Sequence, residues 1–282
     1  MKIGIIGNGF VGKATNILEC DNVELVVYDI NPEICVPKGT TLHDICKCDI
    51  IFISVPTPMN KDGSCYVGIV EKVVKDISEI VNLDEKLVVI RSTIPPGTSD
   101  RLNCYFMPEF LTEKNYEYDF VNCKNWIFGI KGTTQDTLFR YKIMELINSS
   151  YKEECIKFRN ISFVKNSEAE MIKMFRNNFL ALKVSFCNEI EELCRKLNIT
   201  YENVRLLAVL DDRIGESHSA VPGHDGHRGY GGTCFPKDSN SLYNIMKDAN
   251  MESYIIKNMI LRNENVDRVE KDWSEDHGRA VI

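Results

Sequence analysis

The first 160 residues alternate short, continuous apolar runs with segments whose apolar residues recur at helical spacing. Continuous runs of this length predict strands that are buried on both faces of a sheet. The predicted strands cover residues 1–6, 23–28, 49–55, 86–90 and 126–130. The predicted helices cover residues 13–18, 67–81 and 134–148. Regular alternation of strand and helix favours an α/β fold, a doubly wound parallel sheet with helices on both faces.

From about Glu168 the apolar residues recur at spacings of three and four. This stripe comprises Ile172, Phe175, Phe179, Leu182, Phe186, Ile190, Leu193 and Leu197. The spacing predicts one long amphipathic helix. Such a stripe fits either the spine of a dimer or a core helix within one subunit, and the sequence favours neither. A further helical region is expected from Asp238 to about Val269.

The first predicted strand runs directly into Gly7-Asn8-Gly9-Phe10-Val11-Gly12, and the second ends at Asp29. A Gly-x-Gly-x-x-Gly turn between strand and helix, with an acidic residue after the next strand, is the Rossmann fingerprint for dinucleotides. Gly7 permits the tight turn, Gly9 lets the backbone approach a pyrophosphate, and Gly12 allows close packing of helix on sheet. The helix N-terminus would supply N–H groups to the phosphates. Asp29 would accept hydrogen bonds from the adenosine ribose and repel a 2′-phosphate, which favours NAD over NADP.

These patterns predict a domain organisation. We expect an NAD-binding Rossmann domain over residues 1–160, an all-helical central domain over 161–270 and a short tail over 271–282. Loops at the carboxyl ends of the strands line the ligand crevice of such a sheet. Three segments with candidate polar groups, containing Thr57, Thr93 and Glu109, fall in these loops.

Composition narrows the function classes. The 282 residues carry a formal net charge of −7, which argues against general binding to nucleic acid or to anionic membranes. No apolar run reaches the length of a membrane span, and the apolar start of the chain is interpreted as a strand instead of a signal peptide. Eleven scattered cysteines fit reduced thiols in the cytoplasm better than a disulfide framework. His218, His224 and His227 lack the further ligands of a metal site, so no metal is expected.

The segment Gly229 to Asp238, Gly-Tyr-Gly-Gly-Thr-Cys-Phe-Pro-Lys-Asp, places Cys234 behind a run of glycines. Glycines allow tight turns and close approach to a ligand. A thiol held there can attack a carbonyl carbon, while Lys237 and Asp238 tune charge and move protons. Together with the N-terminal glycine motif, this segment indicates covalent catalysis combined with redox chemistry.

Seven segments, in order, resemble the UDP-glucose/GDP-mannose dehydrogenase family and span nearly the whole chain. They are the glycine motif at 7–12, Val55-Pro56-Thr57-Pro58, Ser92 to Thr98, Pro108-Glu109-Phe110-Leu111, the helix with Lys173 and Asn177, Asp212-Arg213-Ile214-Gly215, and Gly231 to Asp238. The resemblance implies the oxidation of a nucleotide-sugar C6 alcohol to a carboxylate, with transfer of four electrons to two NAD⁺. UDP-glucose is the default substrate, and polysaccharide biosynthesis is the expected use of the product.

The resemblance also implies the catalytic roles. Cys234 would attack the intermediate aldehyde to form a thiohemiacetal, which is oxidised to a thioester and hydrolysed. Lys173 would stabilise the developing oxyanion, and Asn177 would hydrogen-bond the reacting centre. Asp238 and Glu109 would move protons, with Glu109 the base for hydrolysis. Thr93 is the last of the implied catalytic residues, and it would position water or the nicotinamide.

By the same resemblance, further residues contact ligands. The cofactor-binding set is Gly7, Asn8, Gly9, Phe10, Val11, Gly12, Asp29, Thr57, Thr93, Glu113 and Lys237. The substrate-binding set is Glu109, Lys173, Asn177, Arg213, Gly223, His227 and Gly231. A homodimer through the long helix is implied, with Arg213 reaching the substrate across the interface. Family members usually carry a third, UDP-gripping domain, which we expect this sequence to lack because it ends about where that domain's first strand would begin.

Two other functions stay open on the residues themselves. A two-electron dehydrogenase of the β-hydroxyacid type also pairs a cofactor domain with a helical domain that carries a lysine and an asparagine, but it does not need Cys234. A non-catalytic NAD-binding module would retain the sites without turnover. The number of NADH molecules formed per substrate separates these possibilities.

Overall fold

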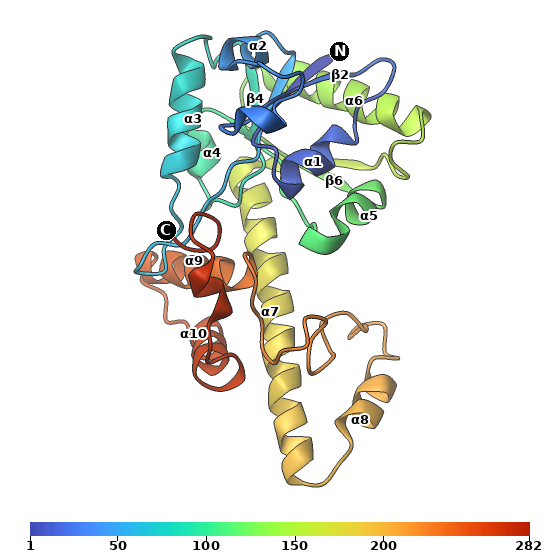
Figure 1. The fold of residues 1–282 in the computed structure, drawn as a ribbon, viewed down its shortest axis with the longest axis vertical. Coiled ribbons are helices and arrows are strands. Elements are labelled where there is room, and N and C mark those ends of the chain that lie inside the picture. The colour runs from blue at the N-terminus through green and yellow to red at the C-terminus, as the bar shows by residue number, and fades with distance from the viewer. The chain divides into compact units, whose positions relative to one another are not determined.

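Seven strands form one sheet in the order β2-β1-β3-β4-β5-β6-β7 in the computed structural model, which describes residues 1–282 (Figure 1). The strands are β1 Lys2–Ile6, β2 Glu24–Tyr28, β3 Ile50–Ile53, β4 Leu87–Ile90, β5 Tyr105–Phe106, β6 Trp126–Ile130 and β7 Ile161–Lys165. All neighbours are parallel except β5 and β6, which pair antiparallel at Phe106 and Gly129. The strand order reverses between β1 and β3, and this switch point is where doubly wound sheets bind ligands.

Successive residues of a strand point to opposite faces of the sheet, so both faces present apolar side chains. Helices cover each of these faces. On one face, α1 (Phe10–Asn16), α5 (Tyr116–Val121) and α6 (Asp136–Lys152) pack with Ile3 and Ile5 of β1. On the other, α2 (Leu42–Cys46) and α3 (Gly68–Ser78) pack with Ile6 of the same strand. The short helix α4 covers Thr98–Arg101. The predicted α/β fold with a doubly wound, mostly parallel sheet is confirmed.

The chain divides into two units at different places from the predicted boundaries. The sheet unit comprises Met1–Thr57 and Val67–Lys173, and the helical unit comprises Pro58–Tyr66 and Met174–Ile282. The division falls after residue 160 because β7 completes the sheet by pairing with β6 in parallel. The segment Pro58–Tyr66 joins the helical unit because the Met59 N–H donates to Ala280 O at 2.8 Å and Met59 O accepts from Ile282 N at 3.1 Å.

The helical unit is built on α7, which runs over Asn166–Lys196 and whose first turns belong to the sheet unit. Its other elements are α8 Tyr201–Ala208, α9 Phe235–Asp248, α10 Ile255–Arg262, a π-helical turn at Asn263–Asp267 and a 3₁₀ turn at Asp272–Glu275. The helical region expected from Asp238 to Val269 is thus interrupted between α9 and α10. None of the helices combines the length and apolar character needed to cross a membrane.

Most of the apolar stripe of α7 faces outward in this structure, while Ile172, Leu182 and Ile190 are half-buried and Leu182 packs against the core of the helical unit. Its exposed fractions are 67% for Phe175, 58% for Phe179, 62% for Phe186, 50% for Leu193 and 59% for Leu197. The opposite side buries polar and small residues instead, namely Asn177, Asn178, Ala181, Ser185 and Asn188. The predicted long amphipathic helix is therefore present, but its stripe is not the core of a single chain.

Candidate active site

The glycine motif forms the turn between β1 and α1. Gly7 has φ +92°, and its N–H donates to Tyr28 O at 2.9 Å. A Cβ on Gly12 would lie 2.0 Å from Gly7 O, so only glycine lets α1 pack this closely on the turn. A Cβ on Gly9 would meet no atom within 4 Å, which leaves open space beside the first turn of α1. Phe10 and Val11 begin that helix, and the geometry fits the approach of a pyrophosphate to backbone N–H groups.

Asp29 lies at the end of β2, directly against the glycine turn. Its carboxylate accepts hydrogen bonds from the Asn8 N–H at 2.7 Å and from the Asn31 N–H at 2.9 Å. The Asn8 side-chain amide donates to Ile34 O at 2.8 Å and so ties the turn to the loop after β2. An oriented carboxylate at this position suits a ribose diol. The glycine turn and Asp29 thus fit NAD.

Two candidate threonines follow neighbouring strands. Thr57 follows β3 and is 4% exposed, and Thr93 follows β4 and is 8% exposed. Ser92 directly precedes Thr93, and its hydroxyl donates to Val55 O at 2.6 Å. This hydrogen bond links the segment after β4 to the segment after β3. Glu113, by contrast, is exposed at the start of a 3₁₀ turn over Glu113–Asn115.

Arg91, which directly follows β4, is a buried cation that is not among the predicted site residues. It is 2% exposed, and its guanidinium donates to Val11 O at 3.2 Å and to the Thr15 hydroxyl. Burial lowers the pKa of Arg91 to about 10, and the group remains charged at neutral pH. It therefore places a positive charge behind the first turns of α1.

Glu109 and Lys173, 64 residues apart in the chain, form a buried ion pair in the sheet unit. The Lys173 ammonium contacts the Glu109 carboxylate at 2.5 Å and Glu109 O at 2.8 Å, with side chains 3% and 5% exposed. The other carboxylate oxygen accepts from the Leu111 N–H at 2.8 Å. Burial opposes ionisation of Glu109, but Lys173 and the Leu111 amide outweigh it and hold its pKa below the ordinary value. A substrate that binds between the Lys173 and Glu109 side chains could exchange a proton with either of them.

Cys234 occupies the N-cap position of α9 and is partly buried. Helix N-termini and neighbouring ammonium groups are the surroundings in which reactive thiols occur. The ammonium is that of Lys237, whose pKa is raised: burial lowers it, but the charges of Asp238, Cys234 and Cys65 have the larger combined effect. Lys237 also pairs with Asp238 at 2.5 Å.

Asp238 connects this helix to α7. It is 1% exposed and accepts a hydrogen bond from the Asn177 amide at 2.6 Å. Asn178, not among the predicted site residues, donates to Asp238 O at 3.3 Å and to Met174 O at 2.9 Å. Asn177 follows Lys173 by four residues on α7, so their side chains leave the helix on the same side. Asn177, Asp238 and Lys237 thus form one polar cluster at the start of α9.

The expected substrate-loop residues are held by local contacts. The Gly223 N–H donates to His227 O at 2.8 Å, and the His227 ring lies 3.3 Å from the Glu270 carboxylate. Gly231 has no room for a side chain, since a Cβ would lie 2.5 Å from the Arg268 guanidinium. Arg213 is 89% exposed and pairs with Asp211, so within one chain it contacts no other candidate residue. The structure contains no group of three or more His, Cys, Asp or Glu side chains that could hold a metal ion.

Two further polar residues belong to these arrangements but were not predicted: Arg91 and Asn178. The only sequence signal for them is a polar residue inside an otherwise apolar element, such as Arg91 at the end of a strand-like run. Such a signal does not identify the hydrogen-bond partner of the residue. In each case that partner lies in a distant part of the chain or is a backbone group.

Comparisons with known proteins identify the family to which both units of the chain are similar. The family model described as "UDP-glucose/GDP-mannose dehydrogenase family, NAD binding domain" matches residues 38–146, and that family's central-domain model matches residues 167–265. A UDP-glucose 6-dehydrogenase of Rickettsia typhi is 29% identical over 93% of this chain and 67% of its own length. Another from Bacillus subtilis is 29% identical over 94% of this chain and 66% of its length. The chain thus spans about two thirds of these relatives.

Solved structures give the same result. A UDP-glucose dehydrogenase from Pyrobaculum islandicum is 26% identical with a TM-score of 0.79, over 93% of this chain and 68% of that one. A UDP-D-ManNAc dehydrogenase from Pyrococcus horikoshii, at 22% identity and a TM-score of 0.74 over 94% of this chain and 68% of its own, shares the fold. The expected family, its NAD cofactor and its class of oxidoreductase are confirmed. The chain belongs to the UDP-glucose/GDP-mannose dehydrogenase family of NAD-dependent enzymes, over its NAD-binding and central domains.

Proposed function

We propose that this chain oxidises the C6 alcohol of a nucleotide sugar to the carboxylate in two steps, with UDP-glucose the first substrate to test. The observation that carries the proposal is Cys234 at the N-terminus of α9, beside the buried cluster of Lys237, Asp238 and Asn177. A simple alcohol dehydrogenase needs no thiol. A thiol is needed when an aldehyde must be oxidised again, because its adduct regains an sp³ carbon that can lose hydride.

The first oxidation needs a base for the hydroxyl proton and a cation for the oxygen. The glycine turn and Asp29 would hold the hydride acceptor, a first NAD⁺ for one oxidation and a second NAD⁺ for the other. Lys173 would leave Glu109 to donate to the C6 oxygen, and Asp238, held by Asn177, would receive the hydroxyl proton. The aldehyde is the product of this step.

The second oxidation proceeds through sulfur. The Cys234 thiolate would form a C–S bond to the aldehyde carbon, and Lys173 and Asn177 would stabilise the oxyanion. Loss of a second hydride and the hydroxyl proton converts the thiohemiacetal into a thioester. Glu109 would then take a proton from water, which attacks the carbonyl carbon and breaks the C–S bond, releasing the carboxylate and the thiol.

The glycine turn, Asp29 and Thr57 would hold the cofactor, with Glu113 and Lys237 as further contacts and Thr93 positioning the nicotinamide or water. Gly223, His227 and Gly231 would contact the sugar nucleotide. The names of the relatives support UDP-glucose as the first candidate substrate.

We also propose that the exposed stripe of α7 pairs with the same stripe of a second copy. Phe175 and Phe179 stack in parallel, with ring centroids 6.1 Å apart, and offer a flat apolar surface to a partner. In such a dimer Arg213, which is exposed in one chain, would be available to the partner's substrate. All eleven cysteines are thiols in the structure, and this supports a reducing cytoplasm as the location, with the uronate entering polysaccharide biosynthesis.

A panel of UDP- and GDP-sugars incubated with NAD⁺ tests the proposal, with NADH absorbance and the acid product both measured. Two NADH per acid support it, while one NADH per product indicates a two-electron dehydrogenase. Cys234→Ser should abolish acid formation and leave NAD⁺ affinity unchanged. Cys155→Ser, a partly buried cysteine of the sheet unit, is the matched control and should retain wild-type turnover. Wild-type acid formation by Cys234→Ser would exclude the covalent route.

A further inference from the structure

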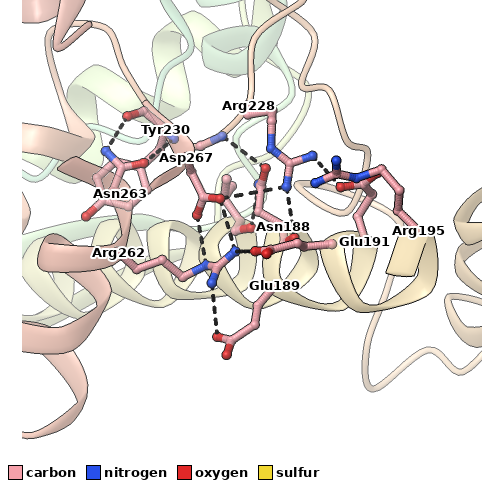
Figure 2. A network of polar contacts seen from close by, with 12 residues as sticks. Asn188, Glu189, Glu191, Arg195, Arg228, Tyr230, Arg262, Asn263 and Asp267 are labelled. Carbon is pink, nitrogen blue, oxygen red and sulfur yellow. Dashed lines mark hydrogen bonds and ion pairs between the residues drawn. The ribbon is translucent and has the colours of Figure 1, made fainter. Parts of the chain in front are cut away.

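The backbone that leads to Cys234 is fastened by a single asparagine from a distant turn. Asn263, the first residue of the π-helical turn, accepts a hydrogen bond from the Tyr230 N–H and donates one to Tyr230 O, both at 2.8 Å. It is 1% exposed, so water does not replace these bonds. Figure 2 shows the Asn263 amide facing the Tyr230 backbone. One side chain therefore satisfies both backbone polar groups of a residue four positions before the thiol.

A second asparagine fixes the preceding residue from the other side. Asn188 on α7 accepts from the Gly229 N–H at 3.1 Å and itself donates to Val184 O at 2.8 Å. Consecutive residues of the loop are thus bonded to two different helical elements. The loop geometry is set by side chains, since neither bond belongs to a regular helix or strand.

Ion pairs hold the π-helical turn against α7. Arg262 contacts Asp267 at 3.0 Å and Glu192 of α7 at 3.2 Å. Arg228, which precedes the loop, contacts Asp267 at 3.7 Å and Glu191 of α7. The dashed contacts in Figure 2 join these charges into one network around the Asp267 carboxylate.

The loop packs closely against the π-helical turn and Arg268. A Cβ on Gly229, which has φ +64°, would lie 2.4 Å from the Asn263 amide oxygen, and one on Gly231 would lie 2.5 Å from the Arg268 guanidinium. The Tyr230 side chain is 4% exposed, and its ring meets the Phe235 ring edge-on at 6.3 Å. Because Phe235 is bonded directly to Cys234, the position of Tyr230 is coupled to that of the thiol.

We propose that Asn263 is a positioning residue for the thiol, one that acts through the Tyr230 backbone and touches neither substrate nor cofactor. The proposal rests on the proposed function for its catalytic consequence. Without Asn263 the loop keeps its apolar anchor but loses both backbone bonds, so Cys234 spends less time in line with the sugar carbon. The expected result is a lower kcat with little change in the KM for NAD⁺, because all the proposed cofactor residues except Lys237 lie in the sheet unit.

The test compares Asn263→Ala, Asn263→Asp and Asn265→Ala in the full chain. Asn265 lies in the same turn, is exposed and donates only to Leu261 O at 2.9 Å, which makes it the matched control. Asn263→Asp keeps the acceptor for the Tyr230 N–H but removes the donor to Tyr230 O, and it serves if the alanine variant does not fold. Steady-state kinetics, thermal unfolding and hydrogen exchange of the peptide covering residues 228–235 are measured for each.

We expect kcat to fall about tenfold in Asn263→Ala, the effect of losing buried hydrogen bonds worth roughly 1.4 kcal/mol. Exchange at residues 229–231 should rise by a similar factor, with Asn265→Ala at wild-type values in both. Equal kinetics in the two alanine variants, or faster exchange throughout the helical unit, would overturn the proposal. If the wild-type chain oxidises no nucleotide sugar, exchange alone still shows whether Asn263 holds the loop, so failure of the proposed function is recognised separately.

Discussion

In the sheet unit, two clusters of large aliphatic and aromatic side chains fill both faces of the sheet, whereas only four buried apolar residues form the cluster of the helical unit. The helical unit buries amides and charges instead, among them Asn188, Asn263 and Asp267. It also leaves the aromatic stripe of α7 exposed. Burial of apolar surface is the main favourable contribution to folding, so the comparison predicts that the helical unit depends more on polar networks and on a partner.

Core truncation should separate the two units most strongly. Phe52→Ala, at a fully buried position of β3, should cost about 3–5 kcal/mol, and Met259→Ala, in the small cluster, about 2 kcal/mol. The chain has two tryptophans, Trp126 in the sheet unit and Trp273 in the helical unit, so each can report on its own unit in urea once the other is replaced by phenylalanine. Equal losses in the two units would contradict the comparison.

Breaking the buried ion pair of the sheet unit should come next. Lys173→Met removes the ion-pair partner of the buried Glu109 carboxylate, at a cost of about 3 kcal/mol at pH 7. In the wild type, Glu109 has a lower pKa in the folded state than in the unfolded chain. The ionised carboxylate therefore stabilises the fold at pH values above the unfolded-state pKa, and this stability is lost as pH falls through the folded-state pKa. In the variant the contribution of Lys173 to the low pKa of Glu109 is lost, so the loss of stability relative to wild type should shrink on acidification. Urea titrations at pH 4.5 and 7.5 measure it, and a pH-independent loss would contradict the prediction.

The glycine turn offers a smaller and more local test. Gly12→Ala should lower both stability and NAD⁺ affinity, because its Cβ would lie 2.0 Å from Gly7 O. Gly9→Ala has open space for its Cβ, so stability should be unchanged while NAD⁺ affinity falls about tenfold if a pyrophosphate occupies that space. Calorimetric titration with NAD⁺ beside thermal unfolding distinguishes the two variants. Unchanged affinity in Gly9→Ala would place the pyrophosphate elsewhere.

The exposed stripe should show the smallest effect on the stability of one chain. Phe179→Glu alters a side chain that is 58% exposed, so the single-chain fold should tolerate it, while a dimer formed through α7 should dissociate. Sedimentation velocity would show a halved mass. Tyr254→Glu, at an apolar position that is 74% exposed but outside the stripe, is the control and should leave the mass unchanged. A wild-type chain that sediments as a monomer would remove the proposed dimer.

Local signals in the sequence sufficed for the elements whose period or turn chemistry is strong. The apolar runs at β1, β3 and β4 and the spacing along α7 depend only on neighbours in the chain, and the structure has them at the expected places. The glycine motif predicted a turn whose conformation Gly7 and Gly12 show directly, at φ +92° and with no space for a Cβ.

The sequence by itself determined the types of element, the family and the residues able to do chemistry, because each is encoded in contiguous segments. Only the tertiary structure decided that Lys173 pairs with Glu109, that Asn263 holds Tyr230 and that the aromatic stripe of α7 faces outward. Likewise, β7 belongs to the sheet because it pairs with β6, whereas its own sequence pattern did not predict a strand. Contacts between residues dozens of positions apart depend on how the whole chain folds, and a local sequence pattern does not contain that information.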